Sequence, residues 1–332
     1  MQFSVIYQLP ERFVHCHMHQ LVEILPGPSL IDIKGRDSSK TMFVSIILHG
    51  NEPTGLYAIQ KFLKHFGGIP PVNLCLLVGN VFAAEHGVRM LHGQPDFNRI
   101  WNGDTSLEEQ WASQVKKYVL EKNPFVVVDL HNNTGRNPHY ACINQLDDSL
   151  YRLSGAFNNQ VVYFETPKET LSIAFSEDVP AVTLECGLPH DLDGVDRAFN
   201  YLVQLAELGD LERLPQNKDF VLYEVQSKIT VKNGFDIFVG DKTTDNAVSF
   251  LRDLDEFNFN FLSEGTVIGR ALSEETPLKV VDAAGLDVHD LYLRYEFGKI
   301  IVNQDVVPSM ISLDPRIISQ DCLGYLMMEK EL

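Results

Sequence analysis

The stretch that decides the fold reads Met42-Phe43-Val44-Ser45-Ile46-Ile47-Leu48-His49-Gly50-Asn51-Glu52-Pro53-Thr54-Gly55. Residues 42–48 are mostly apolar and rich in β-branched side chains, which is typical of a buried strand. Residues 56–66 place apolar side chains at helical spacing, and Pro53 suits the first turn of a helix because its missing N–H costs nothing there. We therefore expect His49 where a strand leaves a sheet and Glu52 just before a helix.

A histidine and a carboxylate three residues apart across such a turn can converge on one cation. Nitrogen and carboxylate-oxygen ligands, with a third ligand from elsewhere in the chain, make up a catalytic zinc site. The alternative is that His49 is a buried, hydrogen-bonded histidine and that Glu52 only favours the helix N-terminus electrostatically. This stretch by itself leaves both interpretations open.

Two more buried strands are predicted to end in ionisable residues. Residues 125–130 lead into His131, and residues 179–184 lead into Glu185. Because such strands alternate with predicted helices, the chain is expected to form βαβ units and a mostly parallel or mixed central sheet flanked by helices. Ligand sites in these sheets lie beyond the carboxyl ends of the strands, so the ionisable residues at all three strand ends are predicted to meet at one rim.

A polar loop over residues 89–103 carries Arg89 and the pair Asn98-Arg99. Loops of this kind are more often functional than structural. Guanidinium groups can stabilise a tetrahedral intermediate or bind a substrate carboxylate. A lone arginine is usually a solvated surface residue, but the Asn98-Arg99 pair stands between two apolar residues and is expected to be held in place.

A histidine cluster lies near the N-terminus, at His15-Cys16-His17-Met18-His19. In a strand the three histidines would share one face and could bind a metal, whereas in a helix they would spread apart. Neither a strand end nor a neighbouring carboxylate supports a metal site there.

Past about residue 217 the pattern changes to short strands separated by glycines, which indicates a small all-β domain. We therefore predict an α/β catalytic domain over residues 1–214 and a β-rich domain over residues 215–332. The second domain lacks a His-Glu constellation and is interpreted as a lid, a substrate-shaping module or an assembly module.

The bulk composition excludes several classes of function. The formal net charge of −18 over 332 residues argues against nucleic acid or an anionic membrane as a partner. No apolar run approaches the roughly 20 residues of a membrane span, and the N-terminal residues lack the features of a signal peptide. The five cysteines are scattered without a C-x-x-C pair, so reduced thiols in a cytoplasm are expected.

Two histidines and one glutamate with an open fourth position make up a known type of hydrolytic zinc site. Zinc lowers the pKa of its bound water from about 15.7 to about 7. A second carboxylate must then take the proton of the water and pass it to the leaving nitrogen. Glu185 is the candidate, because it ends a strand at the same rim. The alternative is that Glu185 is a carboxylate at the core edge, paired with an arginine.

Four motifs follow one another along the chain: His49-Gly50-Asn51-Glu52, Asp96-Phe97-Asn98-Arg99-Ile100, Asp129-Leu130-His131-Asn132 and Thr183-Leu184-Glu185-Cys186-Gly187. In their order and rough spacing the chain resembles the succinylglutamate desuccinylase/aspartoacylase family, which has a zinc carboxypeptidase-like fold. The β-rich C-terminal part also looks like the C-terminal domain of that family. An isolated H-x-x-E is common, whereas the four motifs in order are specific.

The resemblance implies one Zn²⁺ per chain and assigns roles to seven residues. Its implied metal ligands are His49, Glu52 and His131, and its implied general acid/base is Glu185. It also implies that Arg89 polarises the scissile carbonyl and that the substrate carboxylate is bound by Asn98 and Arg99.

The family also uses a further arginine and a tyrosine from its C-terminal domain. Arg136 and Arg152 are candidates for the arginine, and Tyr292 and Tyr295 are candidates for the tyrosine. The sequence leaves both choices open.

The predicted function is a zinc-dependent hydrolase that cleaves the amide bond of a small N-acyl amino acid carrying a carboxylate. One alternative is a metallocarboxypeptidase acting on a peptide or an amidated cell-wall fragment. An alternative of another class is a non-catalytic protein that binds a small molecule on the same fold. The expected location is cytoplasmic, without nucleic-acid or membrane partners, and a homo-oligomer is compatible with the sequence.

Overall fold

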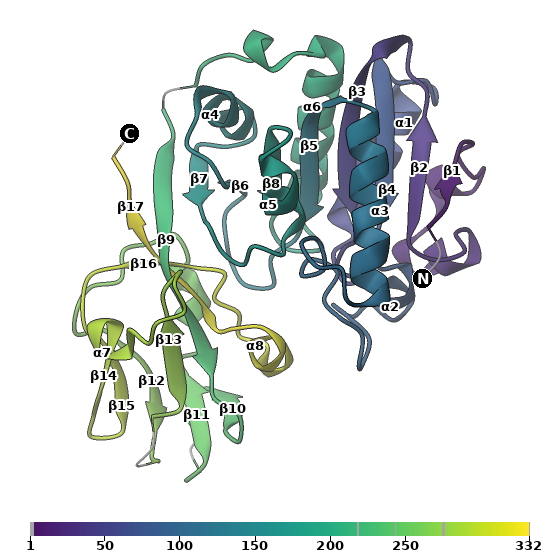
Figure 1. Ribbon diagram of the computed structural model, residues 1–332. Helices are drawn as coiled ribbons and strands as arrows, with labels where there is room; N and C mark the ends of the chain where they lie inside the picture. Colours follow the sequence, from purple (N-terminus) through teal and green to yellow (C-terminus); the bar gives the residue numbers. More distant parts are fainter. Residues whose placement is uncertain (1–2, 218, 243, 274–275, 332) are drawn as a thin grey trace. The chain divides into compact units, whose positions relative to one another are not determined.

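The computed structural model describes residues 3–217, 219–242, 244–273 and 276–331. The chain forms two compact units (Figure 1). The first unit comprises Met1–Asn132 and His139–Phe220, and the second comprises Asn133–Pro138 and Val221–Leu332. The domain boundary between residues 214 and 215 stays a prediction.

The strands of the first unit are β1 (Val5–Ile6), β2 (Ser29–Ile33), β3 (Asp37–Ile46), β4 (Val72–Val78), β5 (Pro124–His131), β6 (Tyr140–Ile143), β7 (Gln160–Tyr163) and β8 (Ala181–Glu185). They form a sheet in the order β1-β2-β4-β3-β5-β8-β6-β7 (Figure 1). β3 is parallel to both β4 and β5, and β5 is parallel to β8. Because β2 and β6 run antiparallel to β4 and β8, the sheet is mixed. The carboxyl ends of β3, β5 and β8 lie at one edge.

The helices of the first unit are α1 (Thr54–His65), α2 (Val81–His86), α3 (Leu107–Glu121), α4 (Asp148–Gly155), α5 (Leu171–Ser176) and α6 (Leu192–Leu208), with 3-10 turns at Phe13–His15, Met18–Glu23 and Leu211–Arg213. α3 and α5 pack on the face of the sheet that carries Phe43 and Val127. α1 packs on the opposite face, where Gly55 lies against Ile46 and Leu130. Helices flank the central sheet, which confirms the predicted α/β fold. In the described part of the chain, no helix is long and apolar enough to cross a bilayer.

α3 begins with the capping box that the Ser106-x-x-Glu109 pattern predicts. The Ser106 hydroxyl accepts a hydrogen bond from the Glu109 amide at 3.1 Å, and the Glu109 carboxylate accepts one from the Ser106 amide at 2.8 Å. We expect Ser106→Ala to lower the free energy of unfolding by about 1 kcal/mol, because one orphan helix donor loses its partner. Urea denaturation measures this difference. Ser113→Ala, at an exposed position of the same helix, is the control; an equal effect of both changes would contradict the capping role.

The strands of the second unit are β9 (Val221–Val231), β10 (Asp236–Val239), β11 (Ala247–Phe250), β12 (Val267–Ala271), β13 (Leu278–Val281), β14 (Leu293–Glu296), β15 (Lys299–Val302), β16 (Val307–Ser309) and β17 (Gly324–Glu329). Short helices α7 (His289–Tyr292) and α8 (Pro315–Gln320) and a 3-10 turn at Leu254–Phe257 connect them. One sheet has the order β10-β11-β12-β15-β14, and β9 pairs with β13 and β17. Buried side chains such as Val248, Phe250 and Ile300 form its core. The predicted β-rich C-terminal part is confirmed.

Candidate metal centre

The turn that carries His49 and Glu52 is shaped by two unusual backbone positions. β3 ends at Ile46, two residues before the predicted strand end, because Ile47 adopts a left-handed φ of 57°. This conformation is rare for a β-branched residue and directs the chain out of the sheet. Gly50 lies so close to α2 that a Cβ atom would come within 2.2 Å of the Ala83 backbone, so a side chain has no room there.

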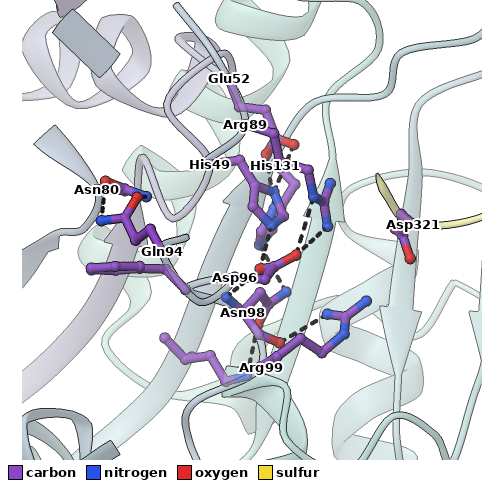
Figure 2. A network of polar contacts seen from close by, with 12 residues as sticks. His49, Glu52, Asn80, Arg89, Gln94, Asp96, Asn98, Arg99, His131 and Asp321 are labelled. Atoms are coloured by element: carbon purple, nitrogen blue, oxygen red, sulfur yellow. Dashed lines mark hydrogen bonds and ion pairs between the residues drawn. The ribbon is translucent and has the colours of Figure 1, made fainter. Parts of the chain in front are cut away.

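Three predicted metal ligands meet at the edge of the sheet. Glu52 lies between two imidazoles, with Oε1 at 2.7 Å from Nδ1 of His49 and Oε2 at 2.9 Å from Nδ1 of His131 (Figure 2). One ligand atom from each of the three residues lies within 4.8 Å of the others, and all three side chains are buried. Two imidazole nitrogens and a carboxylate oxygen suit Zn²⁺ among the divalent ions, so this donor set fits the implied metal.

Each of these histidines is backed by a second carboxylate. Nε2 of His49 donates to Oδ1 of Asp96 at 3.0 Å, and Nε2 of His131 donates to Oδ2 of Asp129 at 2.8 Å. Such hydrogen bonds fix the ring orientation and the tautomer of metal-binding histidines. They leave both Nδ1 atoms directed at Glu52, where a cation would lie.

Contacts between oppositely charged groups outweigh burial in setting the pKa values of the three candidate ligands. Burial and the nearby Arg89 guanidinium act to lower the pKa of His49, but the carboxylates of Glu52 and Asp96 outweigh them and raise this pKa above its usual value. In the same way, Asp129 and Glu52 overcome burial and hold the pKa of His131 well above its usual value. Burial acts to raise the pKa of Glu52, yet the two histidines hold it well below its usual range. The carboxylates around the two rings therefore stabilise positive charge between them.

Glu185 lies at the end of β8, next to His131 in the parallel register of β5 and β8. Burial is the largest cause that raises the pKa of Glu185 to about 7, with a further contribution from Glu52, while His131 opposes the shift. The Oε2 atom of Glu185 is buried and has no hydrogen-bond partner among the described residues. A carboxyl group of this kind can exchange a proton near neutral pH.

The polar loop brings its three predicted residues to the same edge (Figure 2). Nε and Nη2 of Arg89 donate to Oδ2 of Asp96 at 3.1 and 2.8 Å. Nδ2 of Asn98 lies 3.5 Å from Nε2 of His131, while its Oδ1 accepts from the Leu171 amide at 2.9 Å. Nη1 of Arg99 donates to the carbonyl of Asn98 at 2.8 Å. The residues flanking the Asn98-Arg99 pair, Phe97 and Ile100, are buried and anchor the loop in the core.

Asn132, directly after β5, connects the start of α1 with the turn after β8, a role that the sequence did not indicate. Its Nδ2 donates to Oγ1 of Thr54 at 2.8 Å and to the carbonyl of Gly187 at 2.9 Å. Its Oδ1 accepts from the Thr54 amide at 3.1 Å. These bonds hold the first residue of α1 and the turn after β8 against the end of β5. Asparagine adjacent to a strand-end histidine was the only local signal for this role.

The sequence also did not indicate that Asp96 and Asp129 contact the two histidines, although both residues belong to the quoted motifs. For Asp129 a signal existed, because residues 129 and 131 of one strand share a face. No local pattern could connect Asp96 with His49, which lies 47 residues earlier.

The structure does not single out the further arginine or the tyrosine. Arg152 donates from Nη1 to the carbonyl of Leu214 at 2.9 Å. Arg136 belongs to the second unit, where it forms an ion pair with Glu256. Tyr292 is buried in α7, and Tyr295 in β14 stacks on His289 with 5.3 Å between ring centroids.

The histidine cluster at residues 15–19 forms two 3-10 turns rather than a strand or an α-helix. His15 ends the first turn, His17 caps the second, and Nδ1 of His19 lies 3.1 Å from the carbonyl of Glu85. Within the described ranges, the cluster is not among the groups that could hold a metal ion.

Comparisons with known proteins agree with the motifs. The family model described as the succinylglutamate desuccinylase/aspartoacylase catalytic domain matches residues 38–195. No curated protein matches the chain. A succinylglutamate desuccinylase/aspartoacylase from Rhodobacter sphaeroides has a similar fold, with a TM-score of 0.60, 15% identity, and coverage of 91% of this chain and 89% of that chain.

Two other solved structures are similar to a comparable degree. A succinylglutamate desuccinylase from Chromobacterium violaceum has a TM-score of 0.57 and 18% identity, covering 90% of this chain and 86% of that chain. Murine aminoacylase 3 has a TM-score of 0.56 and 16% identity, covering 89% of this chain and 97% of that chain. Identities this low support a shared fold. Together with the family match over all four motifs, they confirm the resemblance: residues 38–195 of this chain match the catalytic domain of the succinylglutamate desuccinylase/aspartoacylase family.

Proposed function

We propose that this protein is a zinc-dependent amidohydrolase that removes the acyl group from a small N-acyl amino acid carrying a carboxylate. One observation carries the proposal. The buried His49-Glu52-His131 group lies at the same sheet edge as Glu185, whose carboxyl group has a buried oxygen without a hydrogen-bond partner among the described residues. One zinc ion per chain would be held by His49, Glu52 and His131, and when bound it would supply Lewis acidity at this position.

Glu185 acts in this proposal as the general base and then as the general acid. The carboxylate takes a proton from the attacking water and returns it to the leaving nitrogen. Its pKa of about 7 supports both steps, because the acid and the base form are then both populated near neutral pH. Its burial keeps bulk water from competing for the proton.

The loop supplies positive charge to the substrate. Arg89 is proposed to polarise the scissile carbonyl, and Asn98 with Arg99 to bind the substrate carboxylate. The support is that all three side chains belong to one anchored loop, and that Asn98 lies beside His131. Two guanidinium groups give this loop positive charge close to the carboxylates of the centre, although the net charge of the chain is −18.

The proposed setting is cytoplasmic, with a small molecule and no nucleic acid as the partner. The support is that all five cysteines are free and buried. In addition, the net charge of −18 disfavours polyanionic partners. The division into a catalytic domain over residues 1–214 and a β-rich domain over residues 215–332 belongs to the same proposal.

A hydrolysis screen tests the function. Zinc-loaded protein is incubated with N-acetyl, N-succinyl and N-formyl amino acids and with short peptides, and the released amine is measured. We expect N-acyl amino acids with a second carboxylate to be cleaved fastest. Faster cleavage of C-terminal residues from peptides would establish the carboxypeptidase alternative instead. Absence of hydrolysis together with absence of bound zinc would favour the non-catalytic binding protein.

A further inference from the structure

Asp96 lies between a proposed metal ligand and a cation of the loop (Figure 2). Its Oδ1 accepts from Nε2 of His49 at 3.0 Å, and its Oδ2 accepts two hydrogen bonds from Arg89, at 3.1 and 2.8 Å. The side chains of Asp96 and Arg89 are only 15% and 10% exposed. Water therefore screens this ion pair weakly, and both partners of Asp96 make strong, charge-assisted contacts.

The carboxylate behind the other histidine is arranged differently. Asp129 is fully buried and its Oδ2 accepts from Nε2 of His131 at 2.8 Å. Its Oδ1 has no hydrogen-bond partner in the part of the chain that the structure describes. Both histidines thus have a supporting carboxylate, but the one behind His49 is shared with an arginine.

The backbone of the loop is tied to the same place. The Asn98 amide donates to Oδ1 of Asp96 at 2.7 Å, and the Gly50 amide donates to the carbonyl of Arg89 at 3.1 Å. Asn80 at the end of β4 and Gln94 in the loop exchange two side-chain amide hydrogen bonds, at 2.8 and 3.2 Å. A shift of Asp96 therefore moves both the loop and the turn that carries His49.

We propose that Asp96 is a positioning residue that couples the metal centre to the loop cation. By holding His49 and Arg89 with its two oxygens, Asp96 makes metal affinity depend on Arg89, although Arg89 is not one of the metal ligands. The same contact places the Arg89 guanidinium at the site only when the ring of His49 is oriented for the metal. The inference rests on the proposed function for the role of Arg89 towards the substrate.

A double-mutant cycle on metal affinity tests this coupling without any activity measurement. Zn²⁺ binding to the metal-free full-length protein is measured by chelator competition for wild type, Arg89→Met, Asp96→Asn and the double variant. The direct effect of the Arg89 charge on the metal is present in both backgrounds and cancels. We expect Asp96→Asn to weaken zinc binding about 10- to 100-fold. The effect of the double variant on the zinc Kd should differ from the product of the two single effects by about threefold or more.

The matched control is the cycle of Arg89→Met with Asp129→Asn. Asp129 supports the other histidine, so its effect and that of Arg89→Met should multiply within about twofold. If Asp96→Asn does not fold, Asp96→Ser replaces it, because a serine hydroxyl can still accept from the Asn98 amide. Multiplicative behaviour in the Arg89/Asp96 cycle would overturn the coupling. A wild type that binds no zinc would overturn it as well.

Kinetics at saturating zinc give a second readout. With the best substrate from the screen, Asp96→Asn should lower kcat/KM about tenfold or more even when every site is loaded, because Arg89 is no longer held in place. In the Arg89→Met background the same change should have less than about a threefold effect on kcat/KM, and an equal loss in both backgrounds would contradict the coupling. A coupled zinc cycle without hydrolysis of any substrate would refute the proposed function but not the role of Asp96.

Discussion

Glu185→Gln is expected to lower the turnover of the best N-acyl amino acid by about 10²- to 10⁴-fold, the usual contribution of a general acid/base. Glutamine has nearly the same shape, but its amide cannot take a proton from water and return it to a leaving nitrogen. Glu185 is buried at the end of β8 and is not one of the three residues grouped around the metal position. The zinc affinity should therefore stay within about threefold of wild type.

The matched control is Glu177→Gln, the same chemical change at an exposed position after α5. It should leave both turnover and zinc affinity unchanged. Turnover is measured as amine release at saturating substrate, and zinc affinity by chelator competition on the same preparations. Full activity of Glu185→Gln would exclude the proposed mechanism. Loss of zinc together with activity would instead make Glu185 a metal ligand.

The position of the centre could be predicted because it depends on local patterns and one rule of topology. Apolar, β-branched runs before His131 and Glu185 mark strands, and parallel strands bring their carboxyl ends to one edge. The helix after Glu52 was expected over residues 56–66 and forms over Thr54–His65. These features depend on neighbours in sequence, so periodicity is enough to find them.

The contacts that complete the site could not be predicted in the same way. Asp96 reaches His49 across 47 residues, and Asn80 meets Gln94 across α2 and the start of the polar loop. Such contacts depend on how the loop packs against the rest of the unit. Hydrophobic periodicity in the sequence does not predict this packing. The left-handed conformation of Ile47 could not be predicted from the sequence either. β-branched residues disfavour this conformation, and a strand was expected to continue there. Tertiary packing imposes both features.

His131→Ala is expected to weaken zinc binding by more than about 100-fold. Loss of an outer hydrogen bond to a metal-binding histidine already weakens binding about 10- to 100-fold, and this change removes the ligand itself. It also removes the imidazole partner of the buried Asp129 carboxylate and one of the two imidazole partners of Glu52, which keeps His49. Zinc should stabilise the wild type by about 4 kcal/mol at a free concentration near 1,000 times Kd, and this gain should vanish in the variant.

Thermal denaturation with and without zinc, together with chelator competition, measures both effects. His17→Ala is the control, because His17 belongs to the rival histidine cluster, is exposed, and should leave zinc stabilisation intact. In the wild type the apparent zinc affinity should also fall as the pH is lowered. The pKa values of His49 and His131 are raised in the metal-free protein, so protons compete for the two Nδ1 atoms. Unchanged zinc stabilisation in His131→Ala, or its loss in His17→Ala, would place the metal elsewhere and remove the basis for the proposed hydrolysis.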